Sequence, residues 1–65
     1  MWTVVYVAQK SQEIFRVKTL LDDNKIICRI RESRNSDEEH GMYFEIMVPA
    51  AELSAAQNLI LDSEI

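Results

Sequence analysis

The sequence predicts an α+β domain in which a three-stranded antiparallel sheet carries two helices on one face. Three segments are rich in β-branched and aromatic residues or alternate apolar with polar residues, as strands do. Two further segments repeat apolar residues at helical spacing. The segments follow one another in the order β-α-β-β-α. Because 65 residues form one domain at most, we expect a single domain over residues 1–65.

The first strand is predicted over residues 2–8 and the first helix directly after it. The strand segment reads Trp-Thr-Val-Val-Tyr-Val-Ala, which is rich in strand-forming types. Ser11 is of the type that caps a helix N-terminus. We expect the helix to end near Asn24, since asparagine tolerates the left-handed conformation of a helix end. The apolar stripe of this helix has i, i+3, i+7 spacing and consists of Ile14, Val17 and Leu21.

The second and third strands are predicted over residues 26–31 and 42–48, joined by a long hairpin loop. The segment 32–41 is polar throughout and contains the single glycine, which indicates a loop. In the third strand Glu45 marks the solvent side. The strand residues expected to face the core are Ile26, Cys28, Ile30, Met42, Phe44, Ile46 and Val48.

Pro49 should end the third strand, since proline cannot donate a hydrogen bond to a strand ladder. A second helix is then predicted from about Glu52 to Leu61. The residues that this helix should bury are Leu53, Ala56 and Ile60.

The element order limits the topology of the sheet. A right-handed crossover leaves a gap between the first two strands that the third can fill, which gives the strand order 1-3-2. The expected fold is ferredoxin-like without its usual fourth strand. The first strand then has an unpaired edge, and the sheet has an uncovered face. If Val5 and Val7 pack beneath the helices, Trp2, Val4 and Tyr6 face outward; the reversed phase would bury Trp2 and Tyr6.

An uncovered apolar and aromatic sheet face is typical of an interface. We expect a non-enzymatic interaction or regulatory module, a homodimer that self-associates through this face or through the edge of the first strand. Another protein is an alternative partner, and a small-ligand sensor at a subunit interface is an alternative function. The expected contact residues are Trp2, Tyr6, Arg29, Arg31 and Tyr43.

An RNA-recognition-like platform is a less favoured interpretation of the same face. In that case Tyr6 and Tyr43 would stack on bases while Arg29 and Arg31 contacted phosphates. The formal net charge of −4 disfavours nucleic-acid binding, because phosphate contacts need a basic field.

The polar residues offer no catalytic constellation. His40 follows the acidic residues 37–39, but one imidazole supplies too few nitrogen ligands for a transition-metal site, so we expect a solvated hairpin tip. Cys28, the single cysteine, alternates in phase with isoleucines and should behave as a small core residue. With one histidine there is no nucleophilic triad. We therefore expect no enzyme activity, no metal and no cofactor.

The sequence favours the cytoplasm as the location of this protein. No apolar run approaches the roughly 20 residues of a membrane span, so no membrane partner is expected. The first residues lack the basic lead and the cleavage site of a signal peptide. A single cysteine excludes an internal disulfide and fits a reducing compartment.

Two segments resemble the DUF2007 family of prokaryotic signal-transducing proteins, and the resemblance covers nearly the whole chain. Residues 20–26, LLDDNKI, are similar to the family's LLxxxGI, and residues 48–56, VPAAELSAA, to its VPxxxxxxA. The resemblance implies a signal-transducing role. The family usually has glycine where this chain has Lys25, which implies that Asn24 supplies the helix C-cap. The family is also similar to the PII signalling proteins, whose long loop between strands two and three corresponds here to residues 32–41.

Overall fold

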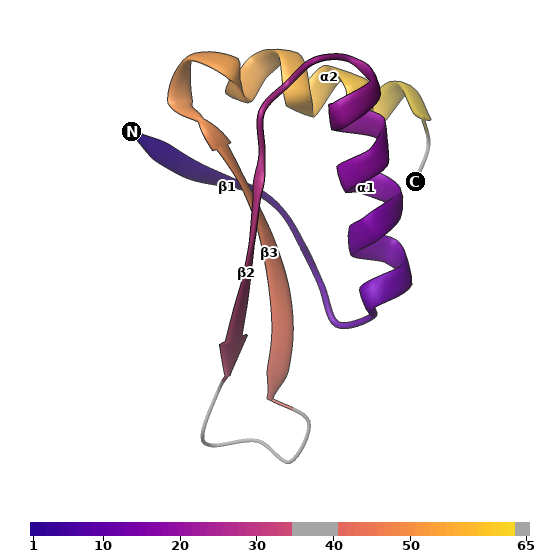
Figure 1. Cartoon of the computed structure of the whole chain (residues 1–65), viewed down its shortest axis with the longest axis vertical. Helices are drawn as coiled ribbons and strands as arrows, with labels where there is room; N and C mark the ends of the chain where they lie inside the picture. Colours follow the sequence, from indigo (N-terminus) through magenta and orange to yellow (C-terminus); the bar gives the residue numbers. More distant parts are fainter. Residues whose placement is uncertain (35–40, 64–65) are drawn as a thin grey trace.

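The computed structural model describes residues 1–34 and 41–63 of the chain (Figure 1). It confirms an α+β fold with the element order β-α-β-β-α. The acidic residues 37–39 and His40, expected at the hairpin tip, lie outside the described residues. The elements are β1 (Trp2–Ala8), α1 (Ser11–Asp23), β2 (Arg29–Arg34), β3 (Met42–Pro49), the 3-10 turn η1 (Ala50–Glu52) and α2 (Leu53–Ser63).

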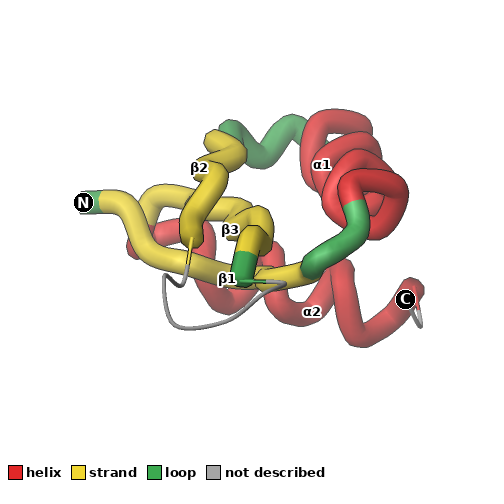
Figure 2. Tube along the Cα trace, turned by 90° about the horizontal axis from the view of Figure 1, so that it is seen from below, coloured by secondary structure: helices red, strands yellow, loops and turns green. Residues whose placement is uncertain are grey.

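The three strands form one antiparallel sheet in the order β1-β3-β2, as predicted. Strand β3 therefore lies in the middle of the sheet, and β1 and β2 are its two edges. Figure 1 shows α1 running beside the twisted sheet, with α2 crossing near one end of α1, and Figure 2 shows the three strands beside one another. Within the described part of the chain, no strand pairs with the outer edge of β1.

A single apolar cluster holds the sheet and both helices together. The predicted stripe of α1 is 0–1% exposed, and Ala56 of α2 is fully buried against the same cluster. Leu53 and Ile60 pack on it while partly buried. Because both helices contribute to this one cluster, both pack on the sheet face that carries its strand residues. The buried members are Ala8, Ile14, Val17, Leu21, Ile26, Ile46, Val48 and Ala56.

The C-terminus of α1 is closed by a residue that the sequence did not indicate. Lys25, with φ of 63°, takes the left-handed conformation, whereas Asn24 has φ of −99°. The Lys25 N–H donates to the Asp22 carbonyl over 3.0 Å, and the Ile26 N–H donates to the Leu21 carbonyl over 2.9 Å. These two bonds, with Ile26 and Leu21 both buried, form a Schellman motif. The helix thus ends at Asp23 with Asn24 in the C-cap position, as predicted, but the left-handed residue is Lys25 and not Asn24.

Asn24 nevertheless assists the helix end, because its side-chain amide donates to the Leu20 carbonyl over 2.8 Å. At the other end of α1, Ser11 is the first helical residue and not the cap. The N-cap position belongs to Lys10, which makes no capping bond through its side chain.

Strand β2 begins three residues later than the sequence predicted. The Ile26 N–H is used to close α1, so residues 26–28 connect the helix to the sheet and the ladder starts at Arg29. At its other end β2 continues to Arg34, which pairs with Met42. Residues 32–34, expected in the loop, thus belong to the strand. Met42 lies at this end of the sheet and is 39% exposed, so its predicted core position was wrong.

The phase of β1 changes within the strand. Val4 lies opposite Met47 and Tyr6 lies opposite Ile46, so Val5 is an extra residue in a β-bulge. The bulge turns both Val5 and Tyr6 toward the core. After it Val7, opposite Glu45, faces away from the helices and is 52% exposed. The expected outward Tyr6 and inward Val7 are therefore both corrected, because a strict two-residue alternation does not hold across a bulge.

Two element boundaries also differ from the predicted ones by one residue. Strand β3 includes Pro49, which lies opposite Trp2. The 3-10 turn η1 precedes α2, which starts at Leu53 and not at Glu52. Neither described helix has the length and apolar character that crossing a membrane requires.

Candidate interaction surface

The sheet face opposite the helices carries a mixed aromatic, apolar and charged surface, which we call the outer face. Its members are identified by the strand register, since they alternate with the buried residues of the same strands. No described helix packs on this side of the sheet. The outer face consists of Trp2, Val4 and Val7 of β1, Arg29, Arg31 and Ser33 of β2, and Tyr43, Glu45 and Met47 of β3.

One half of the outer face is built around a cation–π contact. The guanidinium carbon of Arg29 lies 4.4 Å from the centroid of the Trp2 ring. The two residues come from opposite edge strands, and Met47 of the central strand lies opposite both Arg29 and Val4. The Arg29 side chain therefore reaches across β3 to stack on the indole. The contact ties the two edge strands together on the outer face.

The other half of the outer face is a closed polar network. The Arg31 side chain donates to Glu45 Oε1 from Nε over 3.0 Å and from Nη2 over 2.9 Å, and the Ser33 hydroxyl donates to the same oxygen over 2.9 Å. The Arg31 hydrogen bond, and then that of Ser33, lowers the pKa of the Glu45 carboxyl. The Glu45 side chain is 13% exposed and that of Arg31 is 55% exposed.

The two edges of the sheet differ in charge. No residue of β1 is charged, whereas four of the six residues of β2 are, namely Arg29, Arg31, Glu32 and Arg34. Charged side chains on an edge strand discourage pairing with a foreign strand. By this criterion the edge of β2 is protected against pairing with a strand of another chain, and the edge of β1 is not.

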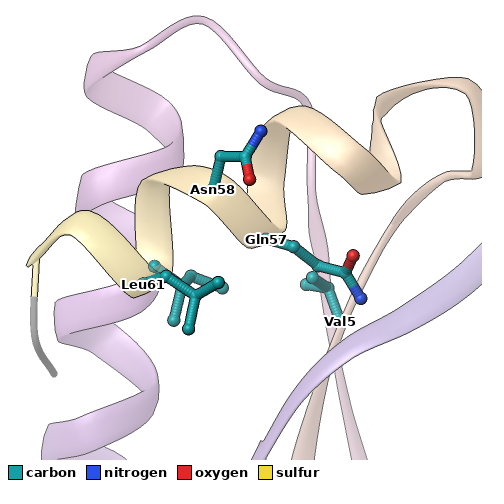
Figure 3. Close-up of a pocket in the computed structure, with 5 residues that line it drawn as sticks. Val5, Gln57, Asn58 and Leu61 are labelled. Carbon is teal, nitrogen blue, oxygen red and sulfur yellow. The ribbon is translucent and has the colours of Figure 1, made fainter.

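A hollow of about 380 Å³ lies between β1 and α2. Val5, the bulged residue, forms its β1 side (Figure 3). The α2 side combines two amides, Gln57 and Asn58, with Ile60 and Leu61. In Figure 3 the Gln57 and Leu61 side chains extend from α2 on the side on which Val5 lies. Leu61 is 74% exposed, the most exposed large apolar residue in either helix, so the rim of the hollow is apolar and open.

Cys28 lies in a setting that suppresses its nucleophilicity. Its side chain is half-buried against the core, and its thiol lies 3.6 Å from Asp22 Oδ1. Burial, and then the negative charge of Asp22, raises the pKa of the Cys28 thiol. Asp22 is also paired with Lys18 over 2.6 Å. Residues 1–34 and 41–63 contain no cluster of three side chains able to hold a metal ion.

The predicted contact residues are only partly brought together. Trp2 and Arg29 are stacked on each other, and Arg31 and Tyr43 also lie on the outer face, with Tyr43 opposite Ser33. Tyr6 is on the other side of the sheet, so the two tyrosines do not form a common stacking platform.

Sequence reasoning did not include Glu45 and Ser33 among the site residues. An opposite-charge pair on facing strand positions is the signal that would have found Glu45. Gln57, Asn58 and Leu61 were also missed. The signal for Leu61 was that this apolar residue lies outside the buried stripe predicted for its helix.

This chain matches no family model, no curated protein and no solved structure.

Proposed function

We propose that this chain is a non-enzymatic interaction module of the signal-transducing kind, which acts in the cytoplasm as a homodimer. The observation that carries the proposal is the sheet surface without a cover. In the described residues the outer face has Trp2, Val4 and Met47 on it, and the edge of β1 has no paired strand. The regulatory part of the proposal is supported by the resemblance of residues 20–26 and 48–56 to the DUF2007 family.

The small size of the core supports self-association. Eight apolar side chains are buried in the described part of the chain, and a chain of this length buries only about 60% of its unfolded surface. Domains of this size commonly add stability through disulfides, a metal or self-association. The single cysteine cannot form an internal disulfide. A second copy would cover apolar surface and satisfy the backbone groups of the β1 edge.

The test is the mass of the chain in solution, measured by light scattering or sedimentation over a range of concentrations. We expect the parent chain to have twice the mass of one chain. Trp2→Ala and Tyr43→Ala probe the outer face at two of its strands, and Phe15→Ala is the matched control, because Phe15 is 58% exposed on α1. A parent chain that is monomeric at all concentrations would contradict the proposal.

The hollow at Val5 favours a second candidate function, that of a small-ligand sensor. Its lining combines apolar side chains with two amides, the mixture typical of ligand sites. A ligand that binds only the folded chain must raise its melting temperature. A panel of small polar metabolites screened by thermal shift tests this function. Gln57→Ala should abolish any such shift, and a shift that survives this substitution would place the ligand elsewhere.

A further inference from the structure

We infer that the second copy docks edge to edge, with two β1 strands pairing antiparallel to make a continuous six-stranded sheet. This inference rests on the proposed self-association and specifies its geometry. Three independent features support it: the contrast in charge between the two sheet edges, the polar network on the outer face, and the uncharged side chains of α2 that line the hollow beside Val5.

The charge contrast selects the pair of strands. A two-fold contact between β2 edges would bring together two strands that each carry three arginines and one glutamate, and their like charges would repel. A contact between β1 edges brings no charges together, because residues 2–8 carry none. Pairing of β1 with itself also closes on a dimer, whereas pairing of β1 with β2 would continue from chain to chain.

The polar network argues against a dimer packed face to face. Such a dimer would remove Arg31, Glu45 and Ser33 of both copies from water. Desolvation of two ion pairs opposes burial of the outer face, and their mutual attraction repays it only in part. Edge pairing leaves the Arg31 side chain, which is 55% exposed, in solvent. It also leaves the stacked Trp2 and Arg29 available to a further partner.

The hollow beside β1 extends the contact beyond the backbone. Val5 is the midpoint of β1, so full overlap of two antiparallel β1 strands places the two-fold axis at this residue. The bulge increases the local twist and limits regular pairing to the residues on either side of Val5. At the axis the Val5 and Leu61 side chains of one copy then meet those of the other, while Gln57, which extends from α2 on the side of Val5, can bond to backbone groups of the added strand (Figure 3).

The experiment separates the edge from the face with one substitution on each. Leu61→Lys places a charge beside the β1 edge and leaves the outer face intact. Tyr43→Ala alters the outer face on the central strand and leaves the edge intact. Phe15→Lys is the matched control, since Phe15 and Leu61 are both exposed helical residues, at 58% and 74%. We expect Leu61→Lys to raise the dissociation constant of the dimer about tenfold or more, while Tyr43→Ala and Phe15→Lys change it less than about threefold.

Amide hydrogen exchange gives a second readout that does not depend on any variant. In the parent chain we expect the outward-facing amides of β1 to exchange more slowly as concentration rises, while the outward-facing amides of β2, which stay in contact with solvent in the dimer, are unaffected. A dimer that tolerates Leu61→Lys and shows no concentration dependence in β1 would overturn the edge geometry and leave the proposed self-association standing. A parent chain that stays monomeric would overturn both.

Discussion

At the scale of single residues, Lys25 holds a conformation that suits glycine better. Its φ of 63° brings the side chain close to the backbone, which costs about 1 kcal/mol in a residue with a Cβ atom. We expect Lys25→Gly to raise the free energy of unfolding by up to about 1 kcal/mol, because relief of this strain outweighs the added flexibility of the unfolded chain. Urea denaturation measures the change.

Asn24→Gly is the control for this prediction. Asn24 has a negative φ, so glycine relieves no strain there, and the substitution removes the bond to the Leu20 carbonyl. Asn24→Gly should therefore lower the free energy of unfolding. Stabilisation by Asn24→Gly with none from Lys25→Gly would mean that the Schellman motif is wrongly placed.

Glu45 gives the stability of the chain a pH dependence whose sign follows from its hydrogen bonds. Arg31 and then Ser33 lower the pKa of Glu45 in the folded chain. The carboxylate therefore contributes stability that is fully present above the unfolded pKa and is lost as the pH falls through the lower folded pKa. Between pH 7 and about pH 3 the urea midpoint of the parent should fall more steeply than that of Glu45→Gln.

Asp22→Asn provides the comparison, because the pKa of Asp22 is lowered by its hydrogen bond to Lys18. Asp22→Asn should also make the urea midpoint fall less steeply with falling pH, because it removes the contribution of Asp22 and leaves that of Glu45. If Glu45→Gln follows the parent at every pH, the network on the outer face does not persist in solution.

At the scale of elements, the bulge in β1 decides which side chains are in the core. Tyr6 packs on the core and Val7 is 52% exposed. We expect Tyr6→Ala to lower the free energy of unfolding by about 2 kcal/mol, since much of an aromatic side chain leaves the core. Val7→Ala should change it by less than about 0.5 kcal/mol. Chemical denaturation of the two variants checks this, and the reverse order of effects would mean that β1 has no bulge.

The elements differ in how well the sequence predicts them. The stripe of α1 and the alternation around Ile46 and Val48 repeat over enough residues to define which side is buried, and both were predicted. The strand order followed from the connections between elements. The bulge at Val5 was not predictable, because Val4, Val5 and Val7 are the same residue type and either alternation satisfies the pattern.

The candidate surface was predictable where it depends on one strand and not where it depends on two. Arg29 and Arg31 were placed correctly by alternation within β2. The start of β2 was misplaced because the Ile26 N–H is taken by the helix end, a bond that depends on Lys25 adopting a left-handed conformation. The hollow at Val5 combines β1 with α2, whose crossing over the sheet no local pattern encodes.

At the scale of the whole molecule, dimerisation would couple the stability of the fold to its concentration. A partner that binds only the folded state stabilises it by mass action. We expect a tenfold rise in chain concentration to raise the melting temperature of the parent by about 3 to 5 °C. Calorimetry at two concentrations measures the difference. Leu61→Lys should melt at a lower temperature than the parent at both concentrations, because its dimer is weaker. A parent whose melting temperature does not change with concentration would have no folded dimer.

The half-buried Cys28 thiol at the junction of α1 and β2 also makes its rate of chemical labelling a measure of whether the chain is folded. With burial and Asp22 holding the pKa of Cys28 above its usual value, the reactive thiolate is scarce while this junction is closed. Alkylation by iodoacetamide should then be slower in the folded chain than in the chain unfolded by urea, where the thiol is exposed and Asp22 is no longer held beside it.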